Sequence, residues 1–244
     1  MRLTLMPILV LVLPIVATAQ TPPPANPPAP LWERKAELSL VSTGGNTDTQ
    51  TLGLGGSLVY RPGRWTTEAR TAFVRSENAD VATAKSFIAD VRESRALTTR
   101  LEAFGRFGYL VDRFAGIDHR STVDGGLGYK LLTGPIHTLR ADAGFGYSRE
   151  SRVSGDDQSF PLVNFGGAYR LQLSKTADIT NAAIATAALD DGDAWRFANA
   201  FAVTAAMTRV FSLKLSHDLK FNNAPVAGFE KTDRLMSVAL VAKF

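Results

Sequence analysis

The stretch that decides the fold is Asp233-Arg234-Leu235-Met236-Ser237-Val238-Ala239-Leu240-Val241-Ala242-Lys243-Phe244. Side chains of a β-strand alternate between two faces, so every second residue lies on the same side. The apolar face carries Met236, Val238, Leu240, Ala242 and Phe244. The other face carries Ser237, Ala239 and Lys243. A strand this apolar on one side needs a protein core or lipid, and the aromatic residue that ends it favours lipid.

The opening segment predicts export. Arg2 precedes an apolar run from Leu3 to Val16, and Ala17-Thr18-Ala19 offers small residues for cleavage. This arrangement is typical of a secretory signal peptide, and the apolar run is too short to span a membrane as a helix. We therefore predict a signal peptide over residues 1–19. The proline-rich residues 20–31 then form an extended periplasmic linker.

Composition limits the class of the remaining chain. The absence of Cys excludes a disulfide framework and a thiolate metal site. A net charge of +4 is too small to indicate nucleic-acid binding. After the leader, no long uncharged apolar run occurs, which argues against a helical membrane protein. Yet 45% of the residues are hydrophobic. Export, alternation and the lack of a spanning helix together predict an all-β transmembrane barrel over residues 32–244.

About twelve alternating segments make up this barrel, and we expect consecutive segments to pair antiparallel in an up-and-down order. The expected strands are 33–43, 48–61, 64–76, 83–97, 100–114, 119–132, 136–151, 159–174, 176–189, 194–208, 211–223 and 233–244. Their connections alternate between tight turns and longer polar loops. Outer-membrane barrels place short turns in the periplasm and long loops outside. With an even number of strands, both ends of the barrel lie on the side of the tight turns, together with the linker.

Aromatic residues of the apolar faces gather at the two ends of the expected barrel. Near the tight turns lie Tyr60, Trp65, Tyr129, Tyr169, Phe211 and Phe244. Near the loops lie Phe73, Phe87, Tyr147, Phe197 and Phe221. Two such belts are typical of the two membrane–water interfaces. The rival folds, a lipocalin-like soluble barrel or a periplasmic sandwich, give no reason for them.

The segment from Trp32 to Thr49 reads Trp-Glu-Arg-Lys-Ala-Glu-Leu-Ser-Leu-Val-Ser-Thr-Gly-Gly-Asn-Thr-Asp-Thr. It resembles the opening of the domain-of-unknown-function 481 family, described as salt-induced outer-membrane proteins. The matching residues are Thr43, Gly45, Asn46, Thr47 and Asp48, with Gly44 as an extra small residue. A hairpin tip by itself also explains these residues, because Gly and Asn tolerate positive φ. The resemblance implies an outer-membrane β-barrel and no defined chemistry.

The polar faces of the expected strands carry charged residues, which a barrel turns into its lumen. The predicted lumen-lining residues are Glu68, Arg70, Asp90, Arg92, Glu102, Arg106, Asp124, Arg140, Asp142, Arg170 and Arg196. The same parity holds for Asp112, Lys130, Asp178, Lys214, Asp218 and Lys220. The two signs are nearly balanced. We expect paired charges that brace a narrow barrel and leave a narrow water path, with opposed ladders in an open pore as the alternative.

Catalytic and metal-binding patterns are weak in this sequence. The spacing of His119, His137 and His217 does not fit a metal site, and Asp190-Asp191-Gly192-Asp193 lacks the order of a calcium loop. His119 and Ser121 share outward parity and resemble the His-x-Ser pair of twelve-stranded outer-membrane phospholipases. The next strand offers no obvious Asn to orient the imidazole. We predict a protein without enzymatic activity, metal or cofactor, with lipid hydrolysis as the alternative.

Taken together, these features predict a monomeric barrel of the bacterial outer membrane. Its signal for assembly is the apolar face Met236, Val238, Leu240, Ala242 and Phe244. We expect a narrow channel for small polar solutes or ions, or an envelope structural or stress protein. The expected partners are outer-membrane lipid, lipopolysaccharide and, during biogenesis, the barrel-assembly machinery. Nucleic acid is not among them.

Overall fold

The computed structural model describes residues 30–43, 49–78 and 81–244. The predicted signal peptide, residues 1–19, and most of the predicted linker lie outside the described residues. So does the tip of the first hairpin, residues 44–48, which carries most of the family-like motif. The strands on both sides of that tip are described.

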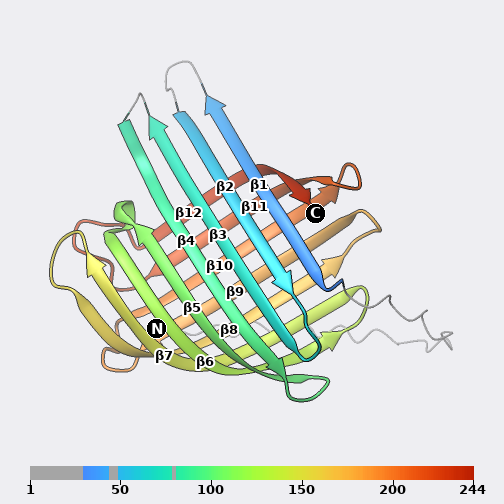
Figure 1. The fold of residues 1–244 in the computed structure, drawn as a ribbon. Coiled ribbons are helices and arrows are strands. Elements are labelled where there is room, and N and C mark those ends of the chain that lie inside the picture. Colours follow the sequence, from blue (N-terminus) through green and yellow to red (C-terminus); the bar gives the residue numbers. More distant parts are fainter. Residues whose placement is uncertain (1–29, 44–48, 79–80) are drawn as a thin grey trace, which may run out of the picture.

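The described residues form twelve strands and one short 3-10 helix. They are β1 Trp32–Thr43, β2 Thr49–Tyr60, β3 Trp65–Asn78, β4 Val81–Ala96, β5 Leu101–Asp112, η1 Arg113–Ala115, β6 Ile117–Thr133, β7 His137–Arg152, β8 Gln158–Gln172, β9 Ala177–Ala188, β10 Trp195–Ala206, β11 Phe211–Asn222 and β12 Thr232–Lys243. Each strand pairs antiparallel with the next, and β12 pairs with β1, so the sheet closes on itself (Figure 1). The predicted twelve-stranded, up-and-down barrel is confirmed. In the described part of the chain, no helix is long and apolar enough to cross a membrane.

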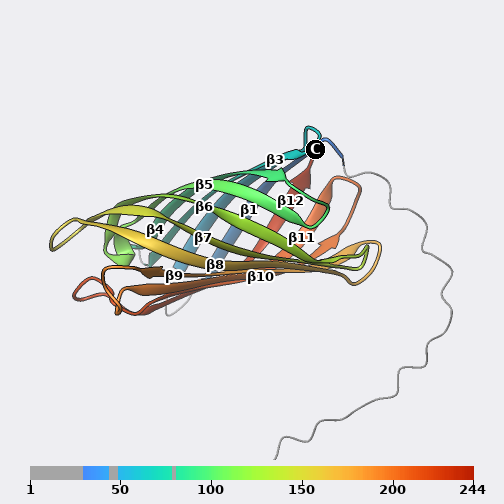
Figure 2. The same ribbon diagram turned by 90° about the horizontal axis from the view of Figure 1, so that it is seen from below.

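The ring order places β3 and β9 on opposite sides of the barrel. Figure 2 shows this arrangement in the turned view, where β8, β9 and β10 form one side and β3 and β5 lie across from them. The seam between β1 and β12 is short, running from Lys35 opposite Lys243 to Ser39 opposite Ala239. The Ser39 hydroxyl extends this seam by donating to the Val238 carbonyl at 2.7 Å.

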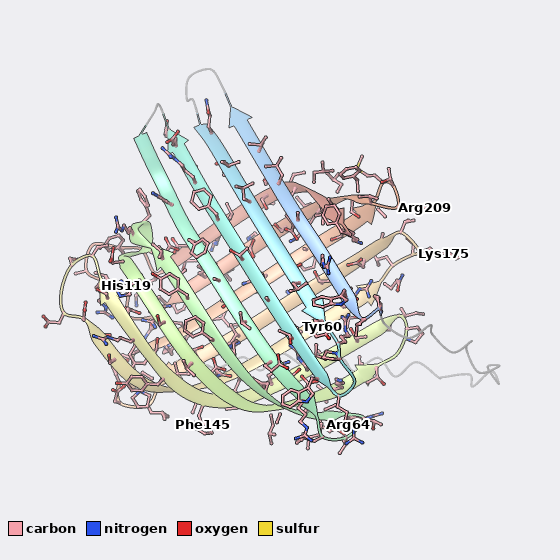
Figure 3. All side chains as sticks on the ribbon, viewed as in Figure 1. Tyr60, Arg64, His119, Phe145, Lys175 and Arg209 are labelled. Carbon is pink, nitrogen blue, oxygen red and sulfur yellow. The ribbon has the colours of Figure 1, made fainter. Side chains whose placement is uncertain are left out.

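Hydroxyl side chains set three of the tight turns. Thr98 Oγ1 accepts the backbone N–H groups of Arg100 and Leu101, and Ser174 and Thr208 make the same pair of bonds in their own turns. Such bonds satisfy backbone donors that a reversing strand leaves unpaired. In Figure 3, Tyr60, Arg64, Lys175 and Arg209 lie at this end of the barrel, and His119 lies at the other.

Two connections differ from the sequence prediction. The loop expected at 115–118 is largely structured, because η1 ends at Ala115 and β6 begins at Ile117. Gly116 ends η1 in the left-handed conformation at φ 81°, which a residue with a Cβ adopts at a cost. The connection expected at 77–82 is much shorter, since β3 ends at Asn78 and β4 starts at Val81.

The outer surface of the barrel is apolar. Phe145, Phe165 and Leu240 expose 73%, 63% and 44% of their surface, while Ala239 and Val241, on the other face of β12, are buried. Phe145 projects from the outside of the barrel in Figure 3. A continuous exposed apolar surface of this kind needs lipid around it. The surface is therefore that of a transmembrane barrel.

The lumen as candidate functional site

Several salt bridges join strands that are not neighbours in the sheet. Glu68 of β3 lies 3.1 Å from Arg140 of β7, and Asp112 of β5 lies 2.9 Å from Lys220 of β11. In a closed barrel, side chains from such strands can meet only across the interior. These residues therefore face the lumen.

The centre of one network is Glu102, whose side chain is 6% exposed. Arg92 Nη2 donates to Glu102 Oε1 at 2.8 Å, and Lys130 and Arg140 approach the same carboxylate at 3.4 and 3.7 Å. Arg92 also reaches Asp142 at 3.3 Å, and thus connects β4 with β7. Three cations and three carboxylates, with Glu68 as the third, are held together. Buried charges in such numbers are stable only when they are paired.

A neighbouring pair completes this side of the lumen. Arg106 Nε donates to Asp124 Oδ2 at 2.9 Å. We call the set on β3–β7 the charged side of the lumen; it comprises Glu68, Arg92, Glu102, Arg106, Asp124, Lys130, Arg140 and Asp142. Its side chains fill the space in front of these five strands.

Two glycines of β6 and β7 lie in close contact with the residues around the charged side. A Cβ atom at Gly128 would lie 2.5 Å from Asp142 Oδ1, and one at Gly146 would meet the backbone oxygen of Val123 first and lie 2.5 Å from the Asp124 Cβ. Both distances are far inside van der Waals contact. A larger residue at Gly128 would push against the Asp142 carboxylate, and one at Gly146 would push against the backbone of β6.

The opposite side of the lumen is lined by small residues. A cavity of ≈ 340 Å³ lies there, bounded by residues from β3 and from β7–β11 and therefore located inside the barrel. We call its small lining residues on β8–β11 the small-residue side; they are Ala168, Thr180, Ala182, Ala200, Ala202 and Ser216. Charged residues also reach the cavity, namely Arg70, Arg170, Lys214 and Asp218.

A third region of the lumen, near the loop end, was missing from the sequence prediction. Glu150 is 1% exposed and is shared by Arg120, Arg152 and Arg196 at 2.7, 2.8 and 2.9 Å. We call these four residues the Glu150 cluster. Only Arg196 was predicted to line the lumen. Glu150 and Arg152 lie on the same face of β7 as Asp142, and Arg120 lies on the same face of β6 as Asp124. The alternation along these two strands was therefore sufficient to predict that all three face the lumen.

The structure separates the other predicted lumen residues. Arg70 pairs with Asp90 at 3.3 Å, and Arg170 pairs with Asp178 at 3.5 Å. The two arginine side chains are 58% and 51% exposed, so neither belongs to the buried network. Both contribute to the lining of the cavity.

The loop between β11 and β12 narrows the loop end of the barrel. Val226 is buried, and a Cβ at Gly116 would lie 2.8 Å from the Val226 Cβ. Phe229 also comes close to Gly116. This loop therefore packs on the connection between β5 and β6, which lies far from it in the ring order (Figure 1).

The residues predicted as the assembly signal lie on the outer face of β12. Met236, Val238 and Phe244 expose 68%, 47% and 77% of their surface. Leu240 is exposed as well, and Ala242 is half-buried between Phe211 of β11 and Ala36 of β1 in the sheet register. The backbone N–H of Phe244 donates to the Arg34 carbonyl at 3.1 Å. Their role in assembly stays a prediction.

Among the described residues, the His-x-Ser pair of the hydrolase alternative gains no supporting contact. The His119 ring lies 3.3 Å from the Asp118 carboxylate, one residue away in sequence. Ser121 lies opposite Tyr109 of β5 and Arg149 of β7, neither of which is the Asn that the resemblance requires. Lipid hydrolysis at this pair stays the untested alternative to the predicted absence of enzymatic activity.

Comparisons with known proteins agree with the resemblance seen in the sequence. The model of the family described as "Protein of unknown function, DUF481" matches residues 36–244. "Uncharacterized protein YdiY" of Escherichia coli (strain K12) is 27% identical over 162 residues, which are 66% of this chain. The match spans 63% of that relative's length.

Solved structures that resemble this chain in their backbone have low sequence identity to it. The structure described as "NanC porin structure in rhombohedral crystal form" is 10% identical with a TM-score of 0.48, and covers 87% of this chain and 97% of its own. The translocator domain of autotransporter NalP from Neisseria meningitidis is 11% identical with a TM-score of 0.45, and covers 87% of both chains.

Proposed function

The chain belongs to the family described as protein of unknown function, DUF481, and we propose that it conducts small polar solutes through a bacterial outer membrane. The observation that carries this proposal is the cavity of ≈ 340 Å³ inside the barrel. A lumen braced from all sides would be filled with side chains. Here the charged side is filled, whereas the small-residue side leaves room for water and small solutes.

The location in the outer membrane is supported by the outer surface and by the chain's expected export. Closed barrels satisfy every backbone hydrogen bond within the sheet, which lipid requires. Tight turns gather at one end, and outer-membrane barrels place such turns in the periplasm. We therefore assign the end with Arg64, Lys175 and Arg209 to the periplasm and the opposite end, where His119 lies, to the outside (Figure 3). The Glu150 cluster lies toward that outer end, because Glu150 and Arg152 are at the end of β7.

The path is narrow and only weakly selective for the sign of an ion. The charged side occupies much of the cross-section, and the loop between β11 and β12 covers part of the loop end. Arg70, Arg170 and Lys214 near the cavity have carboxylate partners in Asp90, Asp178 and Glu37, which reduces their field. We expect small conductance steps with a modest preference.

Planar-bilayer recording of the purified mature barrel tests the proposal. We expect discrete, small steps of current in potassium chloride. A bilayer that holds folded protein and stays silent would contradict the channel function, and would favour the alternative role as a structural or stress protein of the envelope. Folding is checked by heat-modifiable migration on a gel.

The proposed function has no enzymatic step. Purified protein should not release fatty acid from phospholipid vesicles, and Ser121→Ala should behave as the unaltered chain. Turnover that the unaltered chain shows and Ser121→Ala loses would establish the hydrolase alternative instead.

A further inference from the structure

The Glu150 cluster has too few carboxylates for its arginines. Three guanidinium groups surround one carboxylate. In the described part of the chain, none of the three arginines has a salt bridge to any carboxylate other than Glu150. The network around Glu102 differs, because three cations there meet three carboxylates. The cluster therefore carries an excess of two positive charges. Its arginine side chains are 16–18% exposed, so water screens this excess only partly.

Buried hydrogen-bond donors near the cluster also lack acceptors. Arg196 Nε and Asn164 Nδ2 are buried, and neither has a hydrogen-bond partner among the described residues. Asn164 is 1% exposed. Thr186 links these two positions in the sheet, since it lies opposite Asn164 on β8 and opposite Arg196 on β10. Buried donors without partners are rare and costly, so an acceptor is expected at this place.

Several acidic residues at the loop end of the barrel are engaged elsewhere. Asp157 accepts from the Ser151 hydroxyl and from the Arg152 backbone N–H, and so it holds the loop between β7 and β8. Asp191 accepts from the Asp193 backbone N–H within the exposed loop between β9 and β10. Asp112 pairs with Lys220. None of them supplies the missing negative charge.

The guanidinium of Arg196 is held in a defined place. It lies over the Phe160 ring, with 5.4 Å between the Arg196 Cζ and the ring centroid. Phe160 itself packs with Leu162 and Ala188 in the small apolar cluster at this end of the lumen. A guanidinium stacked on an aromatic ring keeps its edge free for hydrogen bonds, and that edge matches the two oxygens of a carboxylate.

We propose that the Glu150 cluster binds a small organic dianion with carboxylate groups, which the barrel admits from its loop end. This inference rests on the proposed channel function and adds the class of solute. Two carboxylates neutralise the excess of two charges and give acceptors to the free guanidinium donors. The dianion site is therefore confined to the cluster, because Arg70, Arg170 and Lys214 along the cavity already have carboxylate partners.

Succinate is the probe that tests the site, and its diamide is the uncharged match. Succinate should bind the folded barrel in detergent, as measured by isothermal titration calorimetry, and succinamide should not. Arg196→Gln removes one charge-assisted contact and should weaken succinate binding by about tenfold to a hundredfold. Lys175→Gln removes the same charge from a tight turn at the other end and should bind as the unaltered chain does (Figure 3).

Two further variants distinguish a loss of binding from a loss of folding. Arg196→Lys keeps the charge but loses the flat guanidinium edge, so it should bind with intermediate strength. Arg120→Gln should weaken binding in the same way as Arg196→Gln. Each variant is compared only after heat-modifiable migration shows a closed barrel. Equal binding of succinate and succinamide, or equal losses in Arg196→Gln and Lys175→Gln, would overturn the proposed site.

Failure of the site and failure of the channel give different results. A barrel that conducts in potassium chloride but does not bind succinate contradicts the dianion site and leaves the channel. A barrel that binds succinate but never conducts contradicts the channel and leaves the site. When both hold, the reversal potential in a succinate gradient should shift toward anions, and Arg196→Gln should reduce that shift.

Discussion

The two sides of this lumen are built from the same alternating strands but have opposite properties. On β3–β7, inward positions carry Arg, Lys, Asp and Glu, which meet across the interior and fill it. On β8–β11, many inward positions carry Ala, Ser or Thr beside the charged Arg170, Lys214 and Asp218, and a cavity remains. Alternation decides which residues face inward. The size of the inward residues on each strand decides where side chains fill the lumen and where a cavity remains.

The division also separates stability from permeability. Salt bridges between non-neighbouring strands fix the shape of the charged side, because each joins parts of the sheet that share no backbone hydrogen bonds. The small-residue side contributes little to this bracing and leaves the space for a path. A substitution on either side should therefore change mainly one of the two properties.

The largest expected effect is on stability, from Glu102→Ala. This change leaves Arg92, Lys130 and Arg140 with one carboxylate fewer in a buried place. Removing one partner of a buried ion pair costs about 3–5 kcal/mol. The free energy of unfolding, measured by urea titration in lipid vesicles, should fall by that order.

The matched control for Glu102→Ala is Asp90→Ala. Asp90 pairs with Arg70, whose side chain is 58% exposed, and exposed pairs contribute about 0–1 kcal/mol. Similar losses in the two variants would mean that the charged side does not brace the barrel.

Much of this architecture could be predicted from the sequence, because it depends on local alternation. The twelve strands, their antiparallel order and the apolar outer face of β12 all follow from residues two apart. The strand bounds were less accurate where tertiary packing decides them. β6 begins at Ile117 because η1 and the loop bearing Val226 pack around Gly116.

The contents of the lumen were harder to predict, since they depend on which strands face one another. The balanced charges indicated pairing, but Arg92 meets Asp142, fifty residues further along the chain, only once the barrel closes. The sequence likewise could not show that three arginines share Glu150. Ala182 and Ala183 look alike in the sequence, and only the structure shows that Ala182 borders a cavity.

The second expected effect is on conductance, from Ala182→Trp. The indole would enter the cavity and occupy much of its volume, so most of the single-channel current should be lost. The control is Ala183→Trp on the same strand, whose side chain faces lipid by parity. Its current in planar bilayers should equal that of the unaltered chain. Equal currents in all three proteins would show that solutes do not pass along the small-residue side.

A smaller effect is expected on selectivity, from the double substitution Arg106→Ala and Arg140→Ala. Asp124, Glu102 and Asp142 each lose a cation. The lumen becomes wider and more negative, and the reversal potential in a potassium chloride gradient should shift toward cations by a modest amount. The matched control replaces both arginines with Lys, which keeps the charge and should keep the selectivity. An unchanged reversal potential in the alanine variant would mean that these arginines do not border the path.

The smallest expected effect is on stability, from two residues on the outer face of β9 and β10, which form part of the small-residue side. Asn181 of β9 and Asn199 of β10 face lipid by parity, and each amide donates to the other's oxygen at 3.2 Å. In the sheet register, Asn181 lies opposite Phe201 and Asn199 lies opposite Ala183. The amide pair therefore links β9 and β10 where small residues line the lumen side of the same strands. Hydrogen bonds between membrane-embedded side chains contribute on average about 0.6 kcal/mol.

A double-mutant cycle isolates this contribution. Asn181→Val or Asn199→Val alone leaves one amide in lipid without its partner, so each single variant should lower the free energy of unfolding. The double variant removes both amides and should recover part of that loss, because two valines suit lipid and fit the strand. A coupling energy of about 0.6 kcal/mol is expected from urea titration in vesicles. If the two single effects simply add, the amides do not stabilise the contact between β9 and β10. The backbone hydrogen bonds between the strands would then be what holds the small-residue side together.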